Sequence, residues 1–302
     1  IGINKSIITN SSNIGYATPI TNFNVIKKEL YNKDFVLIKR PDLGFTTNNT
    51  NESIQKLNGV KKGGVYVCDL IKNSPISNTN IEEGDIITKI NDFDIDNYGL
   101  VRSIFTKNDK TSFIGIFDNI KLGETVRIEY YHNKKKFKKT FKYENYEMPI
   151  KYIYPRFEEI QYEIIGGVVF MDLYLNHLDI INYKTKKLPI ELLKYYKTDE
   201  RLRSEIVISY IYPNTYINNL DILSVGDIIR KVNDIEVSNM MEFRKAILEM
   251  IVFKNTKYLK FDTKDKKQIV LDAKSIINSE KNISETFKFE LTKSYHYLKK
   301  KI

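Results

Sequence analysis

Residues that form covalent cross-links or bind metals are scarce in this sequence. Among its 302 residues there is one cysteine, Cys68, so no internal disulfide can form. Such cysteine usage favours a reducing intracellular or organellar compartment. Three histidines and one cysteine give no spacing typical of a zinc site, and no glycine-rich segment has the neighbours that a phosphate-binding loop needs. We therefore expect neither a metal nor another cofactor.

Long apolar runs are equally scarce. The longest, residues 164–175, is interrupted by Asp172 and is too short to cross a bilayer. The sequence nevertheless contains 21 Tyr and 16 Phe, and 42 % of its residues are hydrophobic, which is enough for a sizeable core. Its length suggests about two domains. We expect a folded protein without a membrane span.

Acidic residues are outnumbered by basic ones, 38 against 48, and the net charge is +10. A basic excess can indicate a nucleic-acid partner. Here the lysines are scattered except at 134–139 and 299–301, and no arginine cluster with interleaved aromatic residues accompanies them. Nucleic-acid binding is therefore unfavoured, and the lysines at 134–139 are expected to keep the edge of a hairpin soluble.

A nine-residue repeat organises the chain. Residues 84–92 (GDIITKIND) recur as residues 226–234 (GDIIRKVND), with seven of the nine positions identical. A short apolar strand and an Asn-containing turn precede each copy, at 65–76 and at 206–217. Two copies of one fold explain this pattern better than chance does.

The residues around the repeat predict mostly β-structure. Alternating apolar residues indicate half-buried strands, and the Asn-Asp pair that ends each copy is typical of a turn. Each copy is followed by one predicted helix, over 111–120 or 240–250, and then by a β-hairpin. The expected fold class is mainly β with short helices (α+β).

These motifs resemble a known family. The strand, the Asn-Ser-Pro of residues 73–75 and the motif at 84–92 are similar to a PDZ domain of the HtrA/Deg serine proteases. Residues 1–20 resemble the last two strands of the trypsin-like protease barrel in that family. Residues 162–170 (YEIIGGVVF), preceded by the Met-Pro-Ile of 148–150, resemble the entry into the second PDZ domain of the plant-type Deg proteases.

The resemblance implies four parts. Residues 1–32 would be the C-terminal strands of the protease barrel with a connector helix. Residues 33–144 and 145–272 would be two PDZ-like β-barrel or sandwich domains, and residues 273–302 a helical basic tail.

Proteolysis in that family requires a serine nucleophile, a histidine base and an aspartate. No Gly-x-Ser-Gly-Gly segment occurs in this sequence. The three histidines are expected to be solvated: His132 in a hairpin turn, His177 in a polar loop and His296 in the lysine-rich tail. The chain should therefore be inactive alone, although the resemblance is to a serine endopeptidase.

The resemblance also implies a peptide-binding groove. A PDZ domain adds a peptide as a strand to a sheet edge and binds its terminal carboxylate with backbone N–H groups of a short loop. In the first unit, Leu43, Gly44 and Phe45 would form that loop and the start of the receptor strand. The helix at 111–120 would form the far wall. Its candidate pocket residues are Phe113, Phe117 and Ile120, with ordinary core side chains as the alternative.

In the second unit the corresponding loop would consist of Gly166, Gly167 and Val168. A polar insertion at 176–203 follows, which could cover the groove or contact a neighbouring subunit. In the resembled subgroup, the second PDZ domain is implied in oligomer assembly more than in substrate capture. We therefore expect a structural role for this unit.

Both ends of the chain add expectations. A loop of the barrel fragment should border the pocket for the residue before the scissile bond, and it consists of Thr9, Asn10, Ser11, Ser12 and Asn13. The tail is expected to form two amphipathic helices, at 272–279 and 284–299, that dock on the second unit or on a partner subunit.

The leading interpretation is the regulatory, substrate-binding portion of an HtrA/Deg-like serine endopeptidase of protein quality control. It would bind apolar segments or C-termini of unfolded protein and peptide substrates, and it would help to assemble a homo-oligomer. The alternative is a non-enzymatic PDZ scaffold that binds the C-terminal tails of partners.

Overall fold

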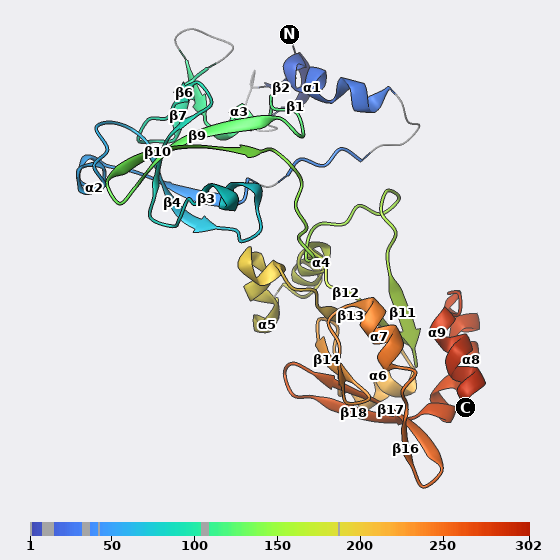
Figure 1. Ribbon diagram of the computed structural model, residues 1–302. Helices are drawn as coiled ribbons and strands as arrows, with labels where there is room; N and C mark the ends of the chain where they lie inside the picture. The colour runs from blue at the N-terminus through green and yellow to red at the C-terminus, as the bar shows by residue number, and fades with distance from the viewer. Residues whose placement is uncertain (1, 8–14, 32–36, 42, 104–108, 187) are drawn as a thin grey trace. The chain divides into compact units, whose positions relative to one another are not determined.

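The computed structural model describes residues 2–7, 15–31, 37–41, 43–103, 109–186 and 188–302 (Figure 1). The chain forms two compact units, Ile1–Tyr146 and Glu147–Ile302. Both consist of antiparallel sheets with short helices, which confirms the predicted fold class.

The first unit begins with an antiparallel strand pair followed by a helix. These elements are β1 (Gly2–Ile7), β2 (Gly15–Pro19) and α1 (Ile20–Leu30). The predicted barrel loop at residues 9–13 lies outside the described residues.

The main sheet of the first unit has the strand order β10-β9-β5-β4-β3, with β6 beside β5, and β7 and β8 form a separate pair. The strands are β3 (Phe45–Asn49), β4 (Val65–Leu70), β5 (Ile86–Ile90), β6 (Phe93–Asp94), β7 (Leu100–Arg102), β8 (Lys110–Ser112), β9 (Thr125–His132) and β10 (Lys135–Lys142). The helices are α2 (Glu52–Leu57), the 3-10 helix η1 (Pro75–Thr79) and α3 (Ile114–Phe117). The helix predicted over 111–120 is shorter, because its first residues pair with β7 as part of β8.

The sheet of the second unit has the order β11-β12-β13-β14-β17-β16, with β15 beside β14 and β18 beside β17. The strands are β11 (Tyr162–Ile165), β12 (Val168–Asp172), β13 (Ile206–Ile211), β14 (Ile228–Val232), β15 (Ile235–Glu236), β16 (Ile251–Phe253), β17 (Thr256–Thr263) and β18 (Gln268–Asp272). The helices are α4 (Leu175–Thr185), α5 (Ile190–Leu193), η2 (Lys194–Tyr196), η3 (Asp199–Arg201), α6 (Tyr216–Leu220), α7 (Met240–Ala246), α8 (Ala273–Phe287) and α9 (Lys293–Lys301).

The repeated glycines and asparagines have the same conformation in both units. Gly84 and Gly226 each have φ of +99°, and Asn91 and Asn233 each have φ of +50°. Each asparagine side chain accepts a backbone N–H from the neighbouring strand at 2.9 Å, β9 in the first unit and β17 in the second. Left-handed backbone favours glycine and asparagine. Turn geometry therefore explains why the same glycine and asparagine recur in both copies of the repeat.

The aspartates of the repeat, Asp85 and Asp227, also form the same backbone hydrogen bond. One carboxylate oxygen of Asp85 accepts the N–H of Glu82 at 2.9 Å, and one of Asp227 accepts the N–H of Ser224 at 2.8 Å. Each bond closes the turn that leads into the following strand.

The insertion at 176–203 is largely helical, and the prediction that His177 lies in a polar loop was wrong. Leu178, Leu192 and Tyr195 are buried in a small core of their own within the second unit. His177 lies in α4, where its Nδ1 accepts the N–H of Tyr174 at 3.0 Å. Burial lowers the pKa of His177 to about 4, so this side chain is not solvated as predicted.

The tail differs from its prediction in one respect. Helix α8 runs without interruption to Phe287, so the break expected between 279 and 284 is absent (red in Figure 1). Ile276 and Ile277 of α8 and Leu298 of α9 belong to the core of the second unit. The tail therefore packs on that unit, which was one of the two predicted alternatives.

Candidate functional site

Leu43 and Gly44, which were predicted to belong to a carboxylate loop, lead into strand β3. Gly44 has φ of +80°, a conformation that disfavours side chains. A Cβ at this position would lie 2.3 Å from the Cβ of Ser74. The Gly44 carbonyl accepts the N–H of Ile71 at 2.8 Å, which fixes the loop to the end of β4. Position 44 therefore requires glycine for both its backbone and its surroundings.

Arg40 connects the approach to this loop with the end of helix α3. Its Nη1 donates to the carbonyl oxygen of Ile120 at 2.8 Å, and its Nη2 donates to that of Asp118 at 2.6 Å. Carbonyl groups at the C-terminal end of a helix lack partners within the helix. Arg40 satisfies two carbonyls just beyond α3 and holds the loop and the helix region together.

Strand β3 is the last strand of its sheet. It pairs with β4 from Phe45↔Leu70 to Asn49↔Val65, and no other described strand pairs with its outer side. An edge strand presents N–H and C=O groups that can pair with another chain. The geometry of β3 thus offers a place for one added strand.

Five of the six predicted peptide-binding residues of the first unit, all except Gly44, come together in its core. Phe45 stacks on Phe113 with ring centroids 6.3 Å apart, and Leu43 packs against the same cluster. Phe113, Phe117 and Ile120 are all buried there. The three residues from the helix region are therefore packed as core side chains, the alternative stated for them, and their role in a pocket stays a prediction.

Two residues of this region were missed by sequence reasoning. Ile114 is 54 % exposed on α3, and it was passed over because it falls outside the apolar face chosen by helical spacing. Arg40 was passed over as one of many scattered basic residues. Its position directly before the Pro-Asp-Leu-Gly segment was the available signal.

The second unit has the same glycine loop but no free edge beside it. Gly166 and Gly167, with φ of +62° and +80°, form a two-residue turn, and Val168 begins β12. Strand β11 precedes the turn and pairs with the outer side of β12, from Ile165↔Val168 to Tyr162↔Met171. The position that is unpaired beside β3 is therefore occupied in this unit.

Helix α7 holds β11 in this position. Arg244 of α7 donates from Nε to Oε1 of Glu163 at 2.6 Å and from Nη1 to Oε1 of Gln161 at 2.7 Å. The carbonyl oxygen of Tyr162 accepts a third bond from the guanidinium at 3.2 Å. Strand β11 is thus tied to both β12 and α7.

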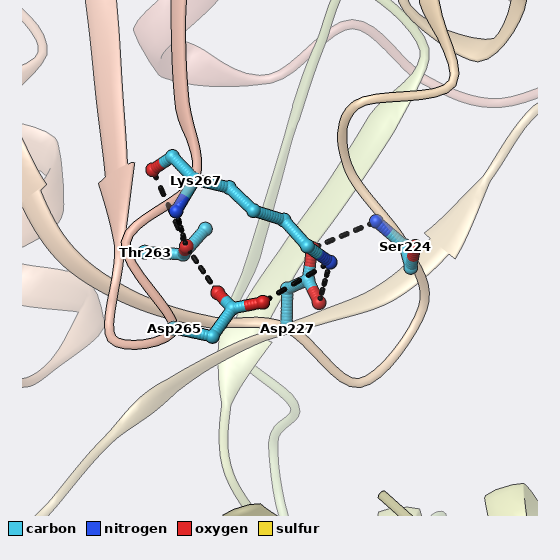
Figure 2. A network of polar contacts seen from close by, with 5 residues as sticks. All are labelled: Ser224, Asp227, Thr263, Asp265 and Lys267. Atoms are coloured by element: carbon cyan, nitrogen blue, oxygen red, sulfur yellow. Dashed lines mark hydrogen bonds and ion pairs between the residues drawn. The ribbon is translucent and has the colours of Figure 1, made fainter.

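The repeat aspartates have different side-chain partners in the two units. Asp85 lies 2.8 Å from Nδ1 of His132, at the end of β9, so the prediction that His132 is a solvated turn residue was wrong. Asp227 instead accepts two bonds from Nζ of Lys267, at 2.8 and 2.9 Å (Figure 2). Burial raises the pKa of both aspartates, and the basic partners oppose that shift. Both pairs are structural links between the turn and the hairpin.

Two further features are absent from the part of the chain that the structure describes. There, no three His, Cys, Asp or Glu side chains converge in a way that could hold a metal ion. No described helix is both long and apolar enough to cross a membrane.

Comparison with known proteins gives matches in both units. Residues 41–142 match a family model described as a PDZ domain, and residues 156–296 match a second model described as a PDZ domain. No curated protein matches the sequence.

Solved structures of HtrA-type proteases show limited similarity. The HtrA-type protease AlgW with a decapeptide has a TM-score of 0.33 and 19 % identity, over 49 % of this chain and 43 % of that chain. A variant of AlgW with a tripeptide has a TM-score of 0.32 and 19 % identity, over 48 % and 44 %. The chain spans less than half the length of these structures. One family match lies in each unit, and each match covers an antiparallel sheet. This chain therefore contains two PDZ domains.

Proposed function

We propose that the first PDZ domain binds the C-termini or exposed apolar segments of other polypeptides as a strand added to β3. The main support is the position of β3. Its outer side is unpaired within the described residues, and the strand begins directly after the Gly44 loop. Strand addition supplies affinity through main-chain hydrogen bonds, and the loop N–H groups bind the peptide carboxylate. Peptide side chains would meet Leu43 and the exposed Ile114.

We further infer that the chain is the regulatory, substrate-binding portion of an HtrA/Deg-like serine endopeptidase of the plant type. Two PDZ domains in tandem follow a strand pair and a helix, in the order that the sequence resemblance implies. The first domain would present unfolded substrates, and the second would support assembly of a homo-oligomer. The serine nucleophile would belong to a protease barrel outside this chain.

A non-enzymatic scaffold is the second candidate. The observation in its favour is that the sequence holds no Gly-x-Ser-Gly-Gly segment. The coding sequence upstream of Ile1 separates the two candidates. A Gly-Asn-Ser-Gly-Gly segment there, with His and Asp farther upstream, supports the protease. Another binding module, or a barrel without that serine, supports the scaffold.

Peptide binding is tested by fluorescence anisotropy. The chain is titrated with a labelled peptide that ends in an apolar residue with a free carboxylate, and with its amidated twin. We expect the free acid to bind at least about tenfold more tightly, which corresponds to about 1.4 kcal/mol. Equal binding of the two peptides, or none, would show that carboxylate capture by the first domain is wrong.

A matched pair of variants locates the site. Ile114→Lys should weaken binding of the free acid several-fold. Leu57→Lys makes the same kind of change on α2, at a side chain that is 71 % exposed, and should leave binding unchanged. Equal effects of the two variants would place the peptide away from α3.

A further inference from the structure

The turn between β11 and β12 contacts a buried acidic side chain. Glu280 of α8 has no solvent exposure, and its Oε2 accepts the N–H of Gly166. The N–H of Gly167 also lowers the pKa of this carboxyl group. Its Oε1 has no hydrogen-bond partner among the described residues. Burial of a carboxyl group is costly unless it is hydrogen-bonded, so the bond from the Gly166 N–H stabilises Glu280 in this place.

These two N–H groups belong to the counterpart of the first domain's carboxylate loop. Gly167 and Gly44 have the same φ of +80°, and each immediately precedes its receptor strand. A Cβ on Gly44 would meet Ser74, and a Cβ on Gly167 would meet Thr215, which has the same place in the repeat as Ser74. Such a loop binds the terminal carboxylate of a peptide. The Glu280 carboxyl group therefore lies at the counterpart of a peptide carboxylate.

Strand β11 likewise has the position and direction of a bound peptide. It runs antiparallel to β12 and ends at the glycine turn. Its last residue, Ile165, is fully buried in the core of the second domain, as the last side chain of a PDZ ligand would be. The chain thus supplies both parts of a ligand, the strand from one segment and the carboxyl group from another.

We propose that the second PDZ domain is occupied by an internal ligand, formed by β11 and the carboxyl group of Glu280. In this arrangement Glu280 is the polar contact between α8 and the glycine turn. The domain takes no peptide from another protein in this state, and the chain binds one peptide at most. This assignment is independent of the function proposed for the first domain.

The contact depends on pH. Burial raises the pKa of Glu280 to about 7, and the N–H groups of Gly166 and Gly167 oppose this shift. Within the described residues no ionised side chain is among the influences on this pKa, and the side chains that meet at Gly166 are Ile217 and Ile276. A folded pKa above the ordinary 4.5 means that docking of the tail is strongest below about pH 4.5 and weakens as the pH rises through 7.

Glycine-selective NMR tests the proposal on the whole chain. With 15N in all 13 glycines, the N–H resonances of Gly166 and Gly167 should titrate with a common midpoint near pH 7. Glu280→Gln should abolish this titration. Glu285→Gln, an exposed position on the same helix, should leave it intact. A titration that is absent from the unaltered chain, or that persists in Glu280→Gln, would overturn the proposal.

Two further measurements guard against a variant that only disturbs folding. Hydrogen exchange should become faster in α8 and α9 of Glu280→Gln than in those of Glu285→Gln, with β12 and β13 still protected. Free-acid peptide should saturate the unaltered chain at one equivalent. Saturation at two would show an open second groove and contradict the proposal. If no peptide binds, the function proposed for the first domain fails, and the glycine titration still decides the internal ligand.

Discussion

The two PDZ domains share their turn residues but differ at the edge of the receptor strand. In the first domain the residues before the glycine loop, 37–41, are irregular, and β3 ends the sheet. In the second domain the residues before the loop form β11, which extends the sheet beyond β12. The repeat therefore determines the fold, whereas the segment just before the loop determines whether an edge remains for a peptide.

Arg244 offers the largest test of this difference. Glu163 is only 2 % exposed, so Arg244→Met would leave a buried carboxylate without its cation. We expect the free energy of unfolding of the second domain to fall by about 3 to 4 kcal/mol, because breaking a buried pair from one side is costly. Denaturant unfolding of the whole chain measures the change.

The double variant Arg244→Met with Glu163→Met is the control for this prediction. It removes both charges and should recover most of the lost stability. A double variant as unstable as Arg244→Met would show that the pair does not hold β11.

The glycine loop of the first domain provides a second test of intermediate size. Gly44→Ala should lower the free energy of unfolding by about 2 to 3 kcal/mol, from the left-handed backbone and from the contact with Ser74. Gly123→Ala is the matched control, because Gly123 has φ of +84° with no neighbouring atom within 4 Å. It should cost only about 1 kcal/mol.

Removal of the obstructing side chain checks the cause. Adding Ser74→Gly to Gly44→Ala should bring the cost down to that of Gly123→Ala. If Gly44→Ala alone lowers the free energy of unfolding no more than Gly123→Ala does, the close contact with Ser74 does not constrain this loop.

The smallest expected difference between the two domains is the loss of stability of the second domain in acid. Burial holds the pKa of His177 at about 4, below the ordinary 6.5, so the folded second domain favours the neutral ring. The stability that this provides is fully present above pH 6.5 and is lost as the pH falls toward 4. We expect a loss of about 2 kcal/mol between pH 6.5 and 4.5.

The prediction is measured as the difference between the unaltered chain and His177→Gln at each pH. This subtraction removes the contribution of Glu280, which has the opposite sign. Parallel pH profiles for the two proteins would show that His177 is not the responsible group.

The sequence predicted the features that depend on local geometry. Gly84, Asn91 and their second copies indicated two similar units, because left-handed turns restrict residue choice. The sequence did not predict that residues 162–165 close the second groove. An apolar strand before a glycine pair has no sequence feature that shows which strand it pairs with. The burial of Glu280 could not be predicted from the sequence either. An acidic residue on an amphipathic helix is usually solvated, and only the tertiary contact with Gly166 shows that Glu280 is not.

The internal ligand has a consequence for the order in which the second domain is completed. Its strand part closes through a two-residue turn, and such hairpins form within microseconds. Its carboxyl part joins residues 114 positions apart, so a ribosome synthesises the glycine turn long before Glu280 exists. Closing so long a loop is entropically costly and comes late. Newly made chains consequently expose the N–H groups of the turn until α8 has been made and has docked, which distinguishes nascent second domains from mature ones.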